Sequence, residues 1–154
     1  MDIAIETTLV DNAKKVEKAL DEQIEQALLA IGATAESYAK LPEDSGGHTP
    51  VDTGRLKNSI TFAIAGRPPN ITSYGVDNPS GKEDTQSRPY SGNAPQDVGG
   101  KPRSVYIGSN VEYAPKIENG VSGEYTGKHF LRLAITDHIQ EYKKLTEAAL
   151  RDKA

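Results

Sequence analysis

The three histidines, His48, His129 and His138, are the first residues to test for chemistry, because imidazole is both a metal ligand and a general base near neutral pH. A zinc site needs ligands that converge on one point with tetrahedral geometry. His129 and His138 are nine residues apart and lie on different turns of a predicted helix. The spacing predicts no metal site. We expect a loop histidine, a histidine at a helix start and a half-buried histidine.

Two carboxylates invite a functional interpretation. Asp52 stands beside Thr53, but no base or second carboxylate is fixed near it by the sequence, so general acid or base work lacks a partner within reach. We expect Asp52 to cap a helix or to form an ion pair. Glu118 has two interpretations that the sequence leaves open. Either it forms a buried pair with Arg55, whose planar fork matches a carboxylate, or both are exposed charges.

Other reactive motifs are missing from the sequence. There is no cysteine, which excludes disulfides, a thiolate nucleophile and cysteine-based zinc sites. The glycine pairs at 46–47 and 99–100 do not follow a strand and open a helix with Lys-Ser or Lys-Thr, as a phosphate-binding loop would. We therefore predict no catalytic residue, no cofactor-binding residue, no metal ligand and no enzyme activity.

Size and charge further limit the kinds of protein that this sequence can encode. The 154 residues fit one domain, 1–154, whose core must be modest because apolar content is 36% and there is no Trp. A net charge of -4 and a pI near 5.4 argue against a protein that grips nucleic-acid phosphates. The acidic N-terminus and the lack of a long apolar run predict neither a signal peptide nor a membrane span, so we expect a cytoplasmic protein or one assembled there.

The N-terminal part is predicted to be helical. Apolar residues recur at steps of three and four from about 11 to 40, which marks one face of an α-helix ended by Pro42. About 28 helical residues would span roughly 42 Å, more than the width of a compact domain of this size. Either Gly32 interrupts the helix or part of it reaches a neighbouring subunit. Residues 1–10 fit a short strand or a mobile arm equally well.

The chain is organised around residues 49–60. Pro50 makes the chain arrive extended, and Asp52 or Thr53 is expected to cap one helical turn. Residues 59–65 then alternate as in a half-buried strand, and 71–76 are expected to form a second, antiparallel strand. Residues 77–103 show no periodicity and predict a long irregular loop.

The second half repeats this mixture. We expect a strand at 104–110, a short helix begun by Pro115, a turn at Asn119-Gly120, a polar loop at 121–127 and a helix at about 129–152. The predicted fold class is α+β: a small antiparallel sheet flanked by a long N-terminal helix and a C-terminal helix, with a long irregular loop.

Three blocks resemble a known family. The run Pro50-Val51-Asp52-Thr53-Gly54-Arg55-Leu56-Lys57-Asn58-Ser59-Ile60 is similar to the signature of bacteriophage head-to-tail joining proteins, the tail-completion or minor tail components of long-tailed phages. Tyr113-Ala114-Pro115-Lys116-Ile117-Glu118-Asn119-Gly120 resembles the second signature of that family, and 128–134 resembles the start of its C-terminal helix. The motif residues carried over are Val51, Asp52, Thr53, Gly54, Arg55, Leu56, Tyr113, Ala114, Glu118 and Gly120.

The resemblance implies a virion structural protein in the neck or head-proximal tail, assembled in the host cytoplasm. It implies a six-fold homo-oligomeric ring between a head connector or stopper and tail terminator or tail tube proteins. DNA would pass through the channel without specific binding, since an acidic lining would not retain it. The 77–103 loop is longer than the resembled family leads us to expect. It offers Arg88, Tyr90 and Arg103 as partner contacts, or for non-specific DNA contact, unless it is simply solvated.

Two other classes remain as alternatives. One is a small DNA-binding or regulatory module of phage origin. The other is an enzyme whose site is assembled between subunits.

Overall fold

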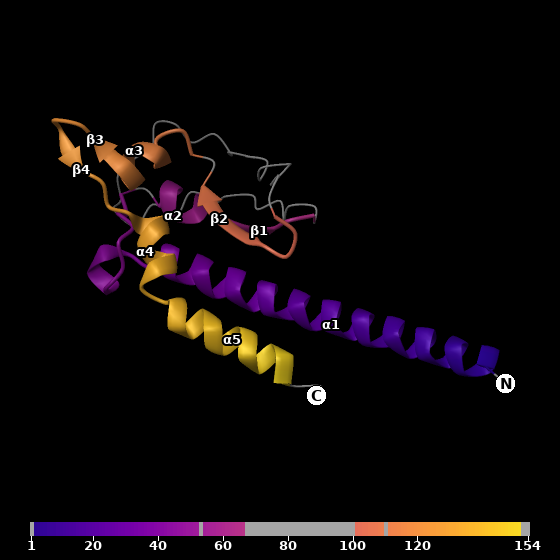
Figure 1. Cartoon of the computed structure of the whole chain (residues 1–154). Coiled ribbons are helices and arrows are strands. Elements are labelled where there is room, and N and C mark those ends of the chain that lie inside the picture. The colour runs from indigo at the N-terminus through magenta and orange to yellow at the C-terminus, as the bar shows by residue number, and fades with distance from the viewer. Residues whose placement is uncertain (1, 53, 67–100, 110, 152–154) are drawn as a thin grey trace.

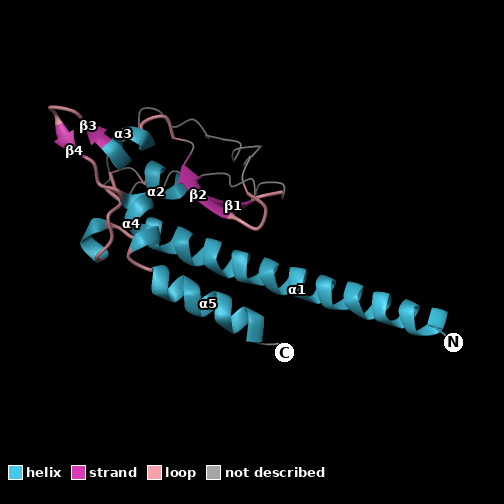
Figure 2. Ribbon diagram, in the orientation of Figure 1, coloured by secondary structure: helices cyan, strands magenta, loops and turns pink. Residues whose placement is uncertain are grey.

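The chain has the mixed α+β fold that the sequence predicts (Figures 1 and 2). A computed structural model describes residues 2–52, 54–66, 101–109 and 111–151. The elements in order are α1 (Asp2–Ala39), a short 3-10 turn η1 (Glu43–Ser45), α2 (Arg55–Ser59), β1 (Ile60–Ile64), β2 (Val105–Ser109), α3 (Ala114–Asn119), β3 (Gly120–Val121), β4 (Tyr125–Thr126), α4 (Phe130–Thr136) and α5 (Ile139–Arg151).

Helix α1 is longer than predicted. It begins at Asp2, so the expectation of a strand or arm over residues 1–10 is wrong. Starting a helix is costly, but extending one fixes only one further residue for each new hydrogen bond. The helix predicted from about residue 11 onward can therefore extend back through residues 2–10. Gly32 does not interrupt α1 either. A Cβ at Gly32 would lie 2.7 Å from Cγ of Phe62, so the glycine lets β1 approach the helix closely.

The end of α1 is fixed by several contacts. Pro42 follows the last helical residue by three positions, as the sequence predicts. Thr49 is fully buried, and its hydroxyl donates a hydrogen bond to the backbone oxygen of Ala39. This contact satisfies a carbonyl in the last turn of the helix and holds the 49–60 segment beside it.

The described sheet around β1 is a two-stranded antiparallel pair. β1 pairs with β2 in a register that places Ile60 opposite Ser109 and Ile64 opposite Val105. On its other edge, the backbone N–H of Phe62 donates to Glu36 Oε2 of α1 at 3.2 Å. The predicted strand at 71–76 lies outside the described residues, as does the 77–100 part of the predicted loop.

The C-terminal helix is divided, which corrects the prediction of one helix over 129–152. α4 ends at Thr136, and α5 begins at Ile139. The break lets the His138 ring stack on Tyr38 of α1, with centroids 3.4 Å apart. α5 then runs antiparallel along the C-terminal half of α1 (Figure 1). The expected polar loop at 121–127 is also more ordered, because β3 and β4 form a small hairpin there.

The core lies where the end of α1 meets α2, β1, α3 and α4. Its buried members are Ala39, Leu56, Ile60, Val111, Ala114, Phe130 and Ala134. The N-terminal half of α1 extends away from this core (Figure 1), and residues 12–22 are exposed. Among the described residues, no helix has the length and apolar character required to cross a bilayer.

Candidate functional site

The first half of the candidate site is the turn that leads into α2. Gly54 occupies the N-cap position with φ 80° and ψ -5°, a left-handed conformation that glycine adopts without steric cost. The N–H of Asn58 donates to the Gly54 carbonyl at 2.9 Å. The N-cap position of α2, which the sequence predicts for Asp52 or Thr53, is held by Gly54, because the chain turns at Gly54 and the helix starts only after it. Thr53 itself lies outside the described residues.

The second half is the start of α3. Tyr113 occupies its N-cap position, Ala114 is buried, and Pro115 lies in the first turn, which confirms the predicted short helix. The guanidinium carbon of Arg55 lies 5.7 Å from the centroid of the Tyr113 ring, within cation–π range. The two segments are about 58 residues apart in sequence and meet directly in space.

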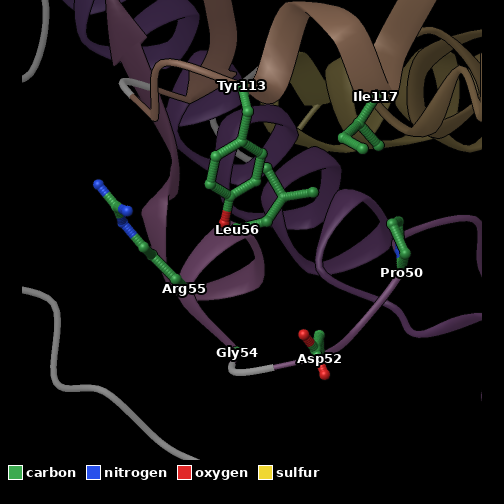
Figure 3. A pocket seen from close by; sticks show the side chains of 7 residues that line it. All are labelled: Pro50, Asp52, Gly54, Arg55, Leu56, Tyr113 and Ile117. Carbon is green, nitrogen blue, oxygen red and sulfur yellow. The ribbon is translucent and has the colours of Figure 1, made fainter. Parts of the chain in front are cut away.

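These segments enclose a cavity of about 350 Å³ (Figure 3). Ile117 comes from α3 and Tyr113 from its N-cap position, whereas Arg55 and Leu56 come from α2. The other lining residues come from the segment before α2. Apolar surface dominates its walls, and Asp52 and Arg55 supply polar groups. The complete lining is Pro50, Asp52, Gly54, Arg55, Leu56, Tyr113 and Ile117.

Of the two interpretations left open for Arg55 and Glu118, the buried pair between them is not formed. Arg55 instead pairs with Glu112 at 3.1 Å, and the Arg55 side chain is 18% exposed whereas that of Glu112 is 62% exposed. Both oxygens of Glu118 accept backbone N–H groups of α4, from Leu131 at 2.9 Å and from Arg132 at 3.1 Å. The first turn of a helix has unpaired N–H donors and favours negative charge, so Glu118 is held there and not by Arg55.

The remaining predicted site residues lie outside the lining of the cavity or outside the described residues. Val51 is 36% exposed beside the cavity, and Gly120 begins β3 directly after α3. Arg103 forms an ion pair with Asp21 of α1 at 2.7 Å, so its described contact is within its own chain. Arg88 and Tyr90 lie outside the described residues.

Sequence reasoning missed Glu112 as the partner of Arg55 and Ile117 as a wall of the cavity. Ile117 follows Tyr113 by four residues, a helical spacing that places both on one face and could have identified it. Glu112 had no such signal, because it is one of many acidic residues and its contact depends on how two distant segments fold together.

The arrangement is suited to receiving an apolar side chain. In the described part of the chain, no three His, Cys, Asp or Glu residues gather as a metal site would require. The histidines are dispersed as expected: His48 is exposed, His129 is the N-cap of α4, and half-buried His138 stacks on Tyr38.

The two tyrosines whose pKa values are raised, Tyr38 and Tyr142, lie at the contact between α1 and α5 and not at the cavity. A hydrogen bond to Glu141, formed at 2.6 Å, raises the pKa of the Tyr38 hydroxyl above its ordinary value. Burial raises the pKa of Tyr142 to about 12. Both groups stay neutral near pH 7, which is typical of structural tyrosines.

Comparisons of this chain with protein-family models, with curated proteins and with solved structures found no significant match. Function must therefore be argued from the three sequence blocks and from the contacts that join them.

Proposed function

We propose that the protein is a virion structural component that joins a phage head to its tail, as a subunit of a ring around the DNA channel. The observation that supports this best is the contact between the two blocks that resemble the joining family. Arg55 of the first block lies over Tyr113 of the second, and Leu56 and Ala114 belong to the same core.

The third block is tied to the same unit. Glu118 of the second block binds the backbone of Leu131, inside the 128–134 block. Phe130, in the same block, is 1% exposed and packs in the shared core. The residues that carry the resemblance therefore serve mainly to hold one scaffold together. Such a use of motif residues favours an assembly protein over an enzyme, whose motif residues would converge on a reactive centre.

The surface supports the same proposal. An acidic chain with a net charge of -4 would not hold DNA that slides through a channel. The cavity offers a neighbouring ring protein a place to insert an apolar side chain. The head connector or stopper on one side and the tail terminator or tail tube on the other are the expected partners.

A deletion tests the proposal. In a phage that encodes this chain, removing the gene should leave filled heads and complete tails that fail to join, visible by negative-stain electron microscopy. The wild-type gene supplied in trans should restore joined particles. Intact infectious virions in the deletion strain would refute the proposal. Tight DNA binding by the purified protein, with a steep salt dependence in gel retardation, would favour the regulatory alternative.

A point variant tests the cavity. Ile117→Glu places a charge on its half-buried apolar wall and should reduce joining while circular dichroism shows the fold retained. Glu124→Gln, in the exposed turn between β3 and β4, is the matched control and should restore joining fully. Full restoration by a folded Ile117→Glu variant would show that the cavity is not a contact site.

A further inference from the structure

The exposed N-terminal half of α1 carries apolar side chains that the described part of the chain does not cover. Val16 is 67% exposed and Leu20 is 44% exposed. They are four residues apart and lie on one face of the helix, with Glu17 at the edge of that face. The segment from 2 to 20 is roughly 28 Å long at the usual helical rise, so it forms an extended arm (Figure 1).

Helix α5 has a second row of exposed residues, which flanks the face packed on α1. Its inner face includes the buried Tyr142. Ile139 is 49% exposed and Leu150 is 39% exposed, and they are eleven residues apart, close to three full turns. Lys143 is exposed on the same face between them. We call the row of Ile139, Lys143 and Leu150 the outer face of α5. Exposed apolar side chains at helical spacing are typical of a face that packs against a second helix.

We infer that the α1 arm of one copy binds the outer face of α5 on the next copy, with the two helices antiparallel. The charges decide this register. When Leu20 is placed on Ile139, an antiparallel arrangement brings Glu17 beside Lys143, so an apolar pair and an opposite-charge pair form together. A parallel arrangement from the same starting pair would place Ile24 opposite Lys143, and the nearest acids, Asp21 and Glu25, would lie about 100° and 140° around the helix from Leu20, farther from the contact than Glu17 at about 60°.

The alternative of two arms pairing with each other is less favourable. An antiparallel pair that sets Val16 against Leu20 brings both Glu17 carboxylates to the same edge of the contact, where like charges repel. Binding between an arm and the outer face of α5 uses two different surfaces of each copy. Such a heterologous contact repeats from copy to copy and closes into a ring when the rotation allows. The inference rests on the proposed function for ring closure, and it names the surfaces that build the ring.

A single contact of this kind is small compared with the roughly 1,200 Å² that a stable interface buries, so it gains strength from ring closure. Covalent trapping is therefore the appropriate test. The chain has no cysteine, so introduced cysteines report one contact without background. We would mix the single variants Leu20→Cys and Ile139→Cys under mild oxidation and examine them by non-reducing electrophoresis.

The link must form between copies. Ile139 follows His138, which stacks on Tyr38, and Tyr38 is 18 residues from Leu20, or roughly 27 Å along α1. A disulfide needs Cα atoms within about 7 Å, so an intramolecular bond is excluded. The mixture should give a cross-linked dimer, each single variant alone should stay monomeric, and the double variant should give a ladder that ends at the ring.

Controls make the result decisive. Lys18→Cys lies two residues from Leu20 on the opposite face of α1, and its mixture with Ile139→Cys should not cross-link. Adding Glu17→Lys to the Leu20→Cys chain should reduce cross-linking several-fold, and Lys143→Glu on the Ile139→Cys chain should restore it. A dimer from Leu20→Cys alone, or a mixture no more cross-linked than the Lys18→Cys control, would overturn the inference.

The two proposals fail separately. If the cysteine variants do not cross-link but the wild-type chain restores head–tail joining, the α1–α5 contact is wrong and the joining function stands. If the ladder forms but the deletion strain makes normal virions, the contact stands and the joining function is wrong.

Discussion

Glu118 and Leu131 are joined by a hydrogen bond in which the Leu131 N–H donates to Glu118 Oε2 at 2.9 Å. The next N–H, that of Arg132, donates to the other carboxylate oxygen at 3.1 Å. The N-cap residue of α4, His129, has φ 53° and forms no side-chain cap. A carboxylate from the preceding helix thus replaces the missing cap and fixes α3 to α4.

Removing this carboxylate should destabilise the fold. Glu118→Ala leaves two N–H groups of α4 without their acceptors, and we expect the free energy of unfolding to fall by about 1–2 kcal/mol. Glu118→Gln retains one accepting oxygen and should lose about half as much. Urea denaturation followed by circular dichroism measures both.

Glu124→Ala is the matched control, because Glu124 lies in the exposed β3–β4 turn and should change the unfolding free energy by less than about 0.5 kcal/mol. Equal losses for the Glu118 and Glu124 variants would show that the cap contributes nothing.

The regular elements could be predicted because their residues repeat in a simple pattern. Ile60, Phe62 and Ile64 alternate as a strand does, and β1 covers these residues. Pro42 correctly marked the end of α1, because proline cannot continue a helix. These features depend on neighbouring residues in the chain, which a sequence displays directly.

The errors concern contacts between distant segments. Helical spacing continues across Asp137 and His138, yet the helix breaks there, and His138 stacks on Tyr38 of α1. For Glu118 the sequence left open a pair with Arg55 or an exposed charge, and neither interpretation included the N–H donors at the start of α4. In both cases the residue contacts a distant partner that no local pattern indicates.

Gly32 provides a test of close packing between α1 and β1. Alanine there gains about 1 kcal/mol of helix propensity, but its Cβ would lie 2.7 Å from ring carbons of Phe62, an overlap that costs about 1–3 kcal/mol. We expect Gly32→Ala to destabilise the wild-type chain by about 1 kcal/mol. In a Phe62→Ala background the overlap is gone, and Gly32→Ala should stabilise. A double-mutant cycle by urea denaturation measures this change of sign, and the same sign in both backgrounds would contradict it.

Arg55 should stabilise the candidate site mainly through packing and not through its ion pair. The Glu112 side chain is 62% exposed, so Glu112→Ala should reduce the unfolding free energy by no more than about 0.5 kcal/mol. Arg55→Ala also removes a largely covered side chain and its contact with Tyr113, for a loss of about 1–2 kcal/mol. Thermal denaturation of the two variants compares them directly. Similar losses would mean that the ion pair dominates.

Tyr142 should make the fold sensitive to alkaline pH. Burial, followed by the charge of Glu141, raises the pKa of its hydroxyl to about 12, above the value near 10 expected when unfolded. The fold favours the neutral hydroxyl, so Tyr142 contributes to the free energy of unfolding. This contribution is complete below pH 10 and is lost as the pH rises through 12, and its size is on the order of 2 kcal/mol.

Tyr142→Phe should lower the free energy of unfolding by about 1 kcal/mol at neutral pH, because the variant loses a hydrogen bond to the Ala134 carbonyl. The same variant should lose less stability than the wild-type chain at alkaline pH. Some loss of stability at alkaline pH should remain in the Tyr142→Phe variant, because the hydrogen bond to Glu141 also raises the pKa of Tyr38. Urea denaturation across this alkaline range checks the prediction, and an equally steep decline in the Tyr142→Phe variant would assign the pH dependence to other groups.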